Sequence, residues 1–389
     1  MPNQRNGSHN VEIKPDIETF AKIKVIGVGG SGGSAIDRML REKIRGVEFI
    51  AVNTDAQALH HSHAPEKVHI GRNTTKGLGA GMDPEIGMKS AEENRDEIHE
   101  MLKGSDMVFI TCGLGGGTGT GASPIIADVA KEVGALTVAV VTKPFSFEGA
   151  ERKTIADRGY TDLADKVDTI IVIPNDRILQ IIDKKTSLLE SFQTVDDVLR
   201  QGVQGIAELI TVPGLINVDF ADVKSIMENA GSALMGIGRG SGENRAVEAA
   251  KAAIDSPLLE VSIDGAKGIL FTVTGGPNLG MYEVNEAARI ITGTADPNAR
   301  VIFGTVIDEN MKDEVKITVI ATGFGDQRKA KRVGAVAATP ERRIEPTPPP
   351  RKPTPQPSMP IVRPKPVEQT KSKEEEELEI PAFIRKKMM

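Results

Sequence analysis

The first half of the chain alternates between short apolar runs and longer amphipathic stretches. The apolar runs are rich in β-branched residues and each is followed by Gly, Asn or Pro; between Ala21 and Asp183 they are IKVIGV, VEFIAVN, KVHIG, MVFITCG, LTVAVVT and TIIVIPN. Runs that are apolar throughout are typical of strands buried on both faces of a parallel sheet. The pattern therefore predicts an α/β fold built of βαβ units.

A long central helix is predicted after this sheet, from 186 to 212. Pro213 and Gly214 end the pattern. The apolar residues that recur at steps of three and four are Phe192, Val195, Val198, Leu199, Val203, Ile206 and Ile210. In a helix, the stretch from Phe192 to Ile210 alone spans roughly 30 Å, enough to run the height of a domain.

A second unit follows the helix and has a different order of elements. Its helical runs are DVKSIMENAGSALM, NRAVEAAKAAI and YEVNEAARIIT, and its strand candidates are KGILFTVTG, RVIFGTVID and EVKITVIATGF. Because strands and helices no longer alternate strictly, we predict a second, smaller domain of mixed α+β type.

The chain changes in composition after about Asp326. Twelve of the 23 prolines lie between Pro340 and Pro381, among charged residues and few large apolar ones, and the apolar run LEIPAFIRKK follows. A segment of this kind cannot bury enough apolar surface to offset its ordering entropy. The predicted parts are a disordered segment at 1–20, a first domain at 21–185, the central helix at 186–212, a second domain at 213–325, a disordered linker at 326–377 and a partner-binding peptide at 378–389.

Composition excludes several classes of protein. The 389 residues carry a formal net charge of -6, no tryptophan and two tyrosines, so neither a general attraction to nucleic acid nor an aromatic platform for single strands is expected. Cys112 is the only cysteine, which excludes an internal disulfide and favours a reducing compartment. No apolar stretch approaches the roughly 20 residues needed to cross a bilayer. We expect a soluble cytoplasmic protein without transmembrane insertion.

Two glycine-rich loops are the first candidates for chemistry. GVGGSGGSA follows the strand IKVI and opens a helix, its glycines fit GxGxxG, and Asp55 closes the next strand, where a dinucleotide fold places its ribose acid. The loop Gly115 to Gly121, GGGTGTG, lies between the strand MVFITCG and another helix. Backbone amides and two threonine hydroxyls suit an anionic group there. A tight turn and a flexible hinge are the alternatives for the two loops.

Two phosphate-binding loops in one domain predict a long polyphosphate. No GxxxxGK[ST] motif occurs, which excludes a P-loop enzyme, and neither loop contains lysine. We therefore expect a divalent cation to supply the countercharge. The histidines of HHSH, from His60 to His63, are expected to be solvated, and the protein ligands of the cation stay unknown from the sequence.

An acidic pair follows the central helix in NVDFADV. Asp219 and Asp222 are three residues apart, so on a first helical turn both carboxylates share one face. From the sequence alone, capping of the helix N-terminus is the more ordinary interpretation.

These motifs, in this order, closely resemble those of FtsZ, the bacterial cell-division homologue of tubulin. The resemblance lies in GVGGSGGSAIDRM, VEFIAVNTDAQAL, GGGTGTG, VTKPFSFEGAERK, IPNDRIL and NVDFADV, covers about Ala21 to Phe324, and extends to LEIPAFIRKK. It implies a tubulin-like fold with a GTP-binding domain at 21–185 and a C-terminal activation domain at 213–325. GTP or GDP and Mg²⁺ are the implied ligands.

The resemblance also implies roles for single residues. It places the phosphates at Gly30, Ser31, Gly32 and Gly33 and at Gly117, Thr118 and Gly119. It places Glu148 and Arg152 near the ribose and the phosphate edge. It places Asn175 and Asp196 on the nucleoside and Phe192 against the base. We expect Gly29, Ser34, Asn53, Asp55, Gly115 and Gly116 to take part in nucleotide binding as well. A carboxylate at Asp196 can accept from both N–H donors of the guanine edge. Ser34 and Asp196 stand where the family commonly has Asn.

In FtsZ-like proteins the acidic loop completes the active site of the next subunit. The resemblance implies that Asn217, Asp219 and Asp222 reach the γ-phosphate held by a neighbour, so that hydrolysis requires a head-to-tail homopolymer. It implies that Leu378 to Lys387 binds membrane-anchoring division proteins such as FtsA, at the mid-cell division site.

Two other classes of protein share some of these features. A nicotinamide-dependent oxidoreductase built on the first glycine loop leaves GGGTGTG unexplained, and the second domain offers no clear His, Lys or Tyr acid–base candidate. A non-hydrolysing member of the tubulin superfamily would lack the acidic pair. The presence of Asp219 and Asp222 favours turnover.

Overall fold

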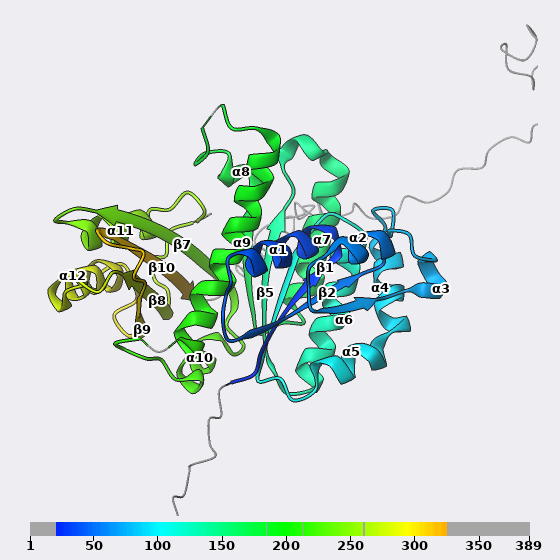
Figure 1. Ribbon diagram of the computed structural model, residues 1–389, viewed down its shortest axis with the longest axis horizontal. Coiled ribbons are helices and arrows are strands. Elements are labelled where there is room, and N and C mark those ends of the chain that lie inside the picture. The colour runs from blue at the N-terminus through cyan, green and yellow to red at the C-terminus, as the bar shows by residue number, and fades with distance from the viewer. Residues whose placement is uncertain (1–20, 184, 213, 260, 325–389) are drawn as a thin grey trace, which may run out of the picture. The chain divides into compact units, whose positions relative to one another are not determined.

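A computed structural model describes residues 21–183, 185–212, 214–259 and 261–324, all within one compact unit of the chain. The predicted segments at 1–20, 326–377 and 378–389 lie outside the described residues. The strands form a ten-stranded sheet with the order β3-β2-β1-β4-β5-β6-β7-β10-β8-β9 (Figure 1). The predicted α/β fold class is confirmed. The predicted domain boundaries stay predictions.

The first part of the sheet is parallel and contains the six predicted apolar runs. Its strands are β1 (Ile23–Val28), β2 (Val47–Asn53), β3 (Glu66–His69), β4 (Met107–Gly113), β5 (Leu136–Lys143) and β6 (Thr169–Pro174). Neighbouring residues of β4 enter different cores, since Phe109 belongs to one hydrophobic cluster and Val108 and Ile110 to another. Both faces are therefore buried, which explains why these strands are apolar throughout.

Helices connect these strands and cover the sheet (Figure 1). They are α1 (Gly29–Arg41), α2 (Ala56–His61), α3 (Arg72–Thr75), α4 (Pro84–Glu93), α5 (Arg95–Leu102), α6 (Thr118–Glu132), α7 (Ala150–Ala164) and α8 (Asn175–Ile178), with a 3-10 turn η1 (Ser146–Glu148) before α7. Helix α1 begins directly after β1, and α6 begins after the short loop that follows the carboxyl end of β4. The two glycine-rich loops thus meet at one edge of the sheet.

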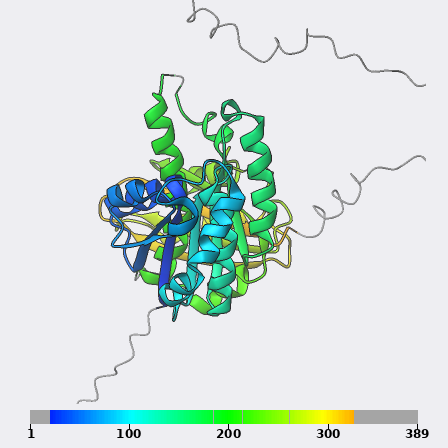
Figure 2. The same cartoon turned by 90° about the vertical axis from the view of Figure 1, so that its right-hand side faces the viewer.

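The long helix α9 (Leu188–Thr211) lies within the range predicted for the central helix. Ser187 and Glu190 form a capping box at its start, in which the Ser187 hydroxyl accepts from the Glu190 amide at 3.2 Å. Its apolar residues pack in one cluster with Val140 of β5 and with Ile320 of the C-terminal part. Figures 1 and 2 both show α9 with the α8 segment at its upper end. The helix spans roughly 36 Å.

The C-terminal part of the sheet is mainly antiparallel. Its elements are α10 (Phe220–Met227), β7 (Gly231–Ser241), α11 (Arg245–Ile254), β8 (Gly268–Gly275), α12 (Met281–Thr292), β9 (Arg300–Ile307) and β10 (Glu314–Thr322). Strand β10 is antiparallel to β7 and β8, β9 is parallel to β8, and β7 continues the sheet from β6. This order agrees with the predicted mixed α+β character.

The prediction of one helix across DVKSIMENAGSALM is wrong in its second half. Helix α10 ends at Met227, Asn229 and Gly231 adopt positive φ values of 52° and 70°, and GSALM begins β7. A β-carbon added to Gly236 or Gly238 would lie 2.0 Å from a carbonyl oxygen of α11. The strand is therefore selected by pairing with β10 and close packing under α11, which helical spacing cannot reveal.

Candidate functional site

A cavity of about 310 Å³ lies at the carboxyl ends of β1, β4, β5 and β6, beside the first half of α9. Ligands bind at this edge of open α/β sheets because the loops that leave the strands converge there. Twelve residues predicted to bind nucleotide line it: Gly29, Gly30, Ser31, Gly116, Gly117, Thr118, Gly119, Glu148, Arg152, Asn175, Phe192 and Asp196. The fold thus brings together residues from five separate segments of the chain.

Two helix N-termini open into this cavity. The residues before α1 and α6 are Val28 and Gly117, neither of which makes a side-chain cap, and neither first turn contains an acidic residue. The first backbone amides of both helices therefore remain available, with the positive ends of two helix dipoles behind them. A β-carbon on Gly30 or Gly116 would meet no atom within 4 Å, so there is room at both loops. The arrangement fits a polyphosphate.

The two glycine loops also support each other. Gly29 and Gly115 have φ values of 73° and 98°, which glycine adopts without strain. A β-carbon on Gly29 would lie 3.0 Å from the Gly119 nitrogen, so the loops approach at the level of their backbones. The Ser31 hydroxyl accepts from the Gly113 amide at 2.7 Å and ties the first loop to the end of β4.

The two threonines of the second loop have different surroundings. Thr118 lines the cavity, and its hydroxyl lies 2.7 Å from that of Thr54. The Thr120 hydroxyl accepts from the Gly115 amide at 2.9 Å and is buried inside the loop. Thr120 therefore holds the loop closed, whereas the sequence suggested donors from both threonines.

The other side of the cavity suits a nucleoside. Glu148 and Arg152 form an ion pair on its wall. Phe192 is 41% exposed and packs edge-on against Phe145, with ring centroids 5.7 Å apart. Asn175 is buried, and its Oδ1 has no hydrogen-bond partner among the described residues. Because an unpaired buried acceptor is costly, this atom points to a ligand that donates a hydrogen bond to it.

Asp196 is the most strongly perturbed acid of the cavity. Burial raises the pKa of its carboxyl to about 7, the positive charge of Arg38 opposes this, and the neighbouring Asp197 adds to it. Half of the carboxyl groups are therefore ionised near neutral pH. A group poised in this way in a cavity is a candidate for ligand recognition.

Some predicted residues lie outside this cavity. Gly33, Ser34 and Asn53 line a neighbouring pocket of about 200 Å³ that shares Gly29 and Gly30 with it, and Gly32 and Gly115 line neither pocket. Asp55 caps α2 by accepting from the amides of Gln57 and Ala58 at 2.8 and 3.0 Å. The position expected for a ribose acid is thus used for helix capping.

Sequence reasoning missed several lining residues, namely Val28, Gly113, Leu114, Thr142, Pro144 and Val195. Thr142 and Pro144 stand at the carboxyl end of β5 and beyond it. The rule that ligands bind at the carboxyl ends of parallel strands could have identified both.

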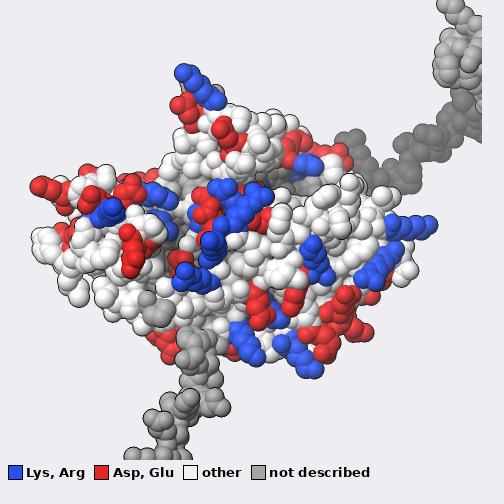
Figure 3. All heavy atoms as spheres, viewed as in Figure 1, with Lys and Arg blue, Asp and Glu red and all other residues white. Residues whose placement is uncertain are grey.

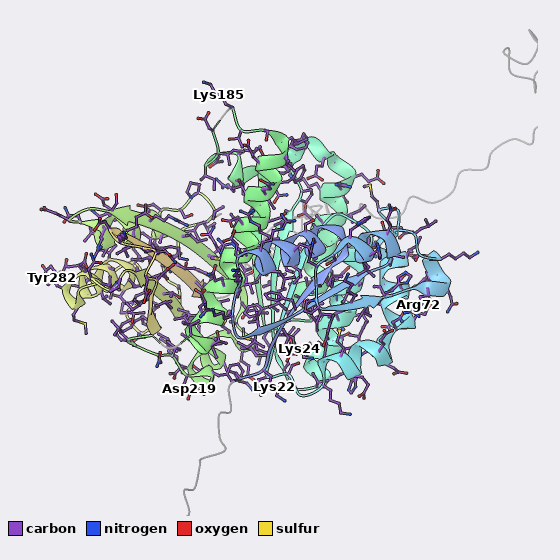
Figure 4. All side chains as sticks on the ribbon, in the orientation of Figure 1. Lys22, Lys24, Arg72, Lys185, Asp219 and Tyr282 are labelled. Atoms are coloured by element: carbon purple, nitrogen blue, oxygen red, sulfur yellow. The ribbon has the colours of Figure 1, made fainter. Side chains whose placement is uncertain are left out.

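The acidic pair lies at the other end of α9. Asp219 and Asp222 are both exposed; Asp219 caps α10 by accepting from the Ala221 amide at 3.2 Å, and Asp222 follows in the first turn. Asn217 is exposed too, and its Oδ1 accepts from the Gly214 amide at 2.6 Å. Figure 4 shows Asp219 and Lys185, which precedes α9, at opposite ends of this part of the chain. The stretch of α9 from Asp196 to Thr211 alone spans roughly 22 Å.

Comparisons with known proteins cover both parts of the sheet. A family model described as "Tubulin/FtsZ family, GTPase domain" matches residues 22–183, and one described as "FtsZ family, C-terminal domain" matches residues 231–325. An empty FtsZ dimer from M. jannaschii is 47% identical, with a TM-score of 0.76, over 80% of this chain and 90% of that one. The chain belongs to the FtsZ family.

Other solved structures agree with this membership. A mutant FtsZ from M. jannaschii is 48% identical over 78% of this chain and 92% of its own, with a TM-score of 0.76. CetZ1 from Haloferax volcanii, a GDP-bound monomer, shares the fold with a TM-score of 0.69 at 23% identity, covering 80% of this chain and 97% of its own.

Membership in the FtsZ family has direct consequences. GTP or GDP binding, GTPase activity and assembly into protofilaments are properties of this family. The oxidoreductase alternative is therefore excluded. The GTPase model matches the segment that contains both glycine loops, so the nucleotide belongs to the parallel part of the sheet.

Two further expectations concern reactive side chains. His60, His61 and His63 are exposed, and within residues 21–324, gaps excepted, no group of three or more His, Cys, Asp or Glu side chains could hold a metal ion. Cys112 is buried in β4, and burial raises the pKa of its thiol to about 11, so it is no nucleophile.

In the described part of the chain, no helix is long and apolar enough to cross a membrane.

Proposed function

We propose that this chain is a GTPase of the cell-division ring that assembles head to tail and hydrolyses GTP where two subunits meet. The observation that supports this proposal is the separation, along α9, of the cavity from the loop that follows the helix. The cavity and the loop with Asn217, Asp219 and Asp222 stand at opposite ends of α9, and these three side chains are exposed. A head-to-tail contact would place the acidic loop of one subunit on the cavity of the next, and repeating that contact yields a filament.

In this proposal each wall of the cavity has its own role. The amides of Gly29 to Ser31 and of Gly116 to Gly119 bind the phosphates, and Arg152 adds a positive charge beside them. The Asn175 Oδ1 accepts from a ribose hydroxyl, which satisfies the atom that is otherwise unpaired. Phe192 packs against the base, and Asp196 accepts from the two N–H groups of the guanine edge. Gly32, Gly33, Ser34, Asn53, Asp55 and Gly115 support these loops from outside the cavity.

Mg²⁺ fits the same arrangement. Neither glycine loop contains lysine, so the phosphate charge calls for another cation. The exposed carboxylates of Asp219 and Asp222 from a neighbouring subunit are hard oxygen ligands of the kind that Mg²⁺ prefers. When bound, Mg²⁺ supplies charge that stabilises the phosphoryl group in the transition state.

Hydrolysis then depends mainly on positioning and charge. The cavity holds the triphosphate so that its γ-phosphate faces the neighbour. The neighbour's carboxylates orient a water molecule in line with the bond that breaks, and the Asn217 side chain helps to hold that water. The loop amides stay on the phosphates while negative charge moves to the leaving oxygen. An isolated subunit would bind GTP and turn it over slowly.

We also propose a role for the C-terminal end, by resemblance to the family. Leu378 to Lys387 would bind membrane-anchoring division proteins such as FtsA, which would place the polymer at the mid-cell division site of the cytoplasm. These residues are apolar at helical steps beside a basic end, as is common in short docking peptides that fold on a groove.

GTP turnover per subunit should rise with protein concentration. A shared active site exists only in the polymer, so phosphate release per subunit should increase at least about tenfold across the assembly threshold. Phosphate release and light scattering, measured on the same samples with GTP and with GDP, test this. If turnover per subunit is flat from well below to well above the threshold, the active site is complete within one subunit.

Affinity for GTP should fall as the pH drops below 7. Burial raises the pKa of Asp196 to about 7, and only its ionised form accepts both guanine N–H bonds. The ionised fraction grows as the pH rises, so the dissociation constant for GTP should be about tenfold larger at pH 6 than on the plateau above pH 8. Titrations of GTP binding at fixed ionic strength measure this.

The matched control for this pH dependence is Asp196→Asn. This variant cannot titrate at that position, so any remaining pH dependence belongs to the nucleotide phosphates. Identical pH profiles for the variant and the natural chain would show that ionisation of Asp196 does not cause the pH dependence of GTP affinity.

A further inference from the structure

Thr54 is a buried residue that lies directly behind the wall of the cavity. It follows β2, is 0% exposed, and lines neither the cavity nor the neighbouring pocket. Its hydroxyl is 2.7 Å from the hydroxyl of Thr118, the first residue of α6, which does line the cavity. Thr54 can therefore act on a bound ligand only through Thr118.

The backbone around Thr54 is held by bonds that do not involve its side chain. The Thr54 carbonyl oxygen accepts from Nε2 of His69, the last residue of β3, at 3.0 Å. The Ala56 amide donates to the Gly77 carbonyl oxygen at 3.1 Å, and the carboxylate of Asp55 caps α2. The position of Thr54 is thus fixed independently of its hydroxyl, and that hydroxyl is directed at Thr118.

Burial decides which of the two hydroxyls is the donor. Each hydroxyl has one proton, so only one of the pair can donate to the other. The Thr54 hydroxyl has no other acceptor among the described residues, so if Thr118 were the donor, the buried proton of Thr54 would have no partner. Such a loss is costly. Thr54 is therefore the donor, and the proton of Thr118 is left for a ligand in the cavity.

The bond from Thr54 also makes Thr118 a better donor. Hydrogen bonds that follow one another in a chain polarise each other, so a hydroxyl that accepts a bond donates a stronger one. The partner that gains most from such a donor is an anionic oxygen, because charge-assisted hydrogen bonds are the strong ones. The arrangement therefore suits a phosphate oxygen next to Thr118.

The two segments that meet at this pair of threonines contain no Lys or Arg. Helix α2, which begins two residues after Thr54, has none, and neither does the glycine loop from Gly115 to Gly121. On the face seen in Figure 3, the largest group of Lys and Arg atoms lies where α1 meets α9 and not over α2. Where this loop meets a phosphate, its donors are backbone amides and the Thr118 hydroxyl, so the direction of that hydroxyl matters.

We propose that Thr54 is a positioning residue, whose hydroxyl donates to the Thr118 hydroxyl and so directs the Thr118 proton to a phosphate oxygen of the nucleotide. This role rests on the proposed function, since the cavity must hold a nucleotide. Thr54 itself touches neither the nucleotide nor the reacting atoms.

A double-mutant cycle on the two hydroxyls tests this role. Dissociation constants for GDP and GTP would be measured below the assembly threshold with the natural chain, Thr54→Val, Thr118→Val and the double variant. Thr54→Val keeps the branched shape and should raise both constants roughly fivefold, as for the loss of one neutral hydrogen bond. Thr118→Val should raise them at least as much. The double variant should bind within about twofold of Thr118→Val, because Thr54 then has nothing left to position.

Thr54→Ser is the matched variant that keeps the hydroxyl. It loses only a methyl group and should bind both nucleotides within about twofold of the natural chain, since the bond to Thr118 remains. Thr111→Val is the control for the removal of a buried hydroxyl. Thr111 is 0% exposed in β4, and its Oγ1 has no hydrogen-bond partner in the described part of the chain, so nucleotide binding should not change.

The outcomes distinguish the role of Thr54 from the proposed function. If Thr54→Val weakens binding by the same factor with and without the Thr118 hydroxyl, Thr54 acts through packing and the proposal is overturned. Unchanged binding by Thr54→Val, or binding by Thr54→Ser as weak as that of Thr54→Val, overturns it as well. In each of these cases the natural chain still binds guanine nucleotides. If the natural chain binds neither GDP nor GTP, the proposed function fails, and the role of Thr54 fails with it.

Discussion

Asp222→Asn should lower GTP turnover by at least about 100-fold and leave the dissociation constant for GTP unchanged. The substitution removes a charge that would act only on the phosphoryl group of a neighbour's nucleotide, and loss of one such group commonly costs two or more orders of magnitude. Asp222 is preferred to Asp219, because the Asp219 carboxylate also caps α10 and its loss would disturb the helix. Single-turnover phosphate release and equilibrium GTP binding measure the two quantities.

The matched control for Asp222→Asn is Glu228→Gln. Glu228 is exposed and directly follows α10, so this variant removes an acidic charge near the same surface while leaving the first turn intact. Its turnover should stay within about twofold of the natural chain, as is usual for exposed charges away from a site. A loss of GTP binding in Asp222→Asn would indicate that the residue serves the cavity of its own subunit.

Mixing two inactive variants would test the shared site directly. Asp222→Asn retains its cavity, and a second variant with a blocked cavity retains its acidic loop. Copolymers should recover part of the turnover, because some contacts pair an intact cavity with an intact loop. Absence of recovery in copolymers that assemble would contradict hydrolysis between subunits.

Arg245→Met should destabilise the chain by about 3 kcal/mol, the lower end of the cost of removing one partner of a buried ion pair, because the Glu283 side chain is 24% exposed. Arg245 is 6% exposed and binds Glu283 through two bonds, from Nε to Oε1 at 2.8 Å and from Nη2 to Oε2 at 3.0 Å. It also donates to the carbonyl oxygens of Asn278 and Lys312 at 3.1 and 3.4 Å. One guanidinium thereby joins the starts of α11 and α12 and two loops. Denaturant unfolding followed by circular dichroism measures the loss.

This effect should depend on pH. Hydrogen bonds from Arg245 hold the pKa of Glu283 below its usual range. The stabilisation is therefore fully present at pH values above the pKa that Glu283 has in the unfolded chain. It is lost as the pH falls through the lower pKa that Glu283 has in the folded chain. The difference in stability between Arg245→Met and the natural chain should shrink in acid.

Arg239→Met provides the control for Arg245→Met. Arg239 and Glu314 form an ion pair at 3.8 Å, and their side chains are 60% and 55% exposed. Such surface pairs contribute less than about 1 kcal/mol. A loss in Arg245→Met as small as in this control would show that neighbouring groups or water replace the guanidinium.

The parallel part of the fold was predictable from the sequence because its information is local. A strand such as β4 is buried on both faces, so its residues are apolar without interruption, and the glycines beyond it mark the turn into α6. The C-terminal part was less predictable. The sequence at the start of β7 has the pattern of a helix end. It forms a strand because β10 pairs with it and α11 packs on its glycines.

The candidate site also has features that the sequence could predict and features that it could not. The glycine loops can be recognised because phosphate binding uses backbone amides, and these require a particular local sequence. The orientation of side chains could not be recognised: Thr118 faces the cavity and Thr120 its own loop, and Asp55 caps α2. Each of these outcomes depends on which neighbour competes for one hydrogen bond.

By itself, the sequence determined the α/β class, the two loops suited to phosphate and the presence of an acidic pair after the central helix. These features rest on periodicity and on residue types that act within a few positions. Only the tertiary structure decided that Asp196 is half-buried in the wall of the cavity, and that Asp219 and Asp222 stand at the far end of α9 from it. The physical reason is that burial, charge environment and separation are set by the packing of segments that are distant along the chain.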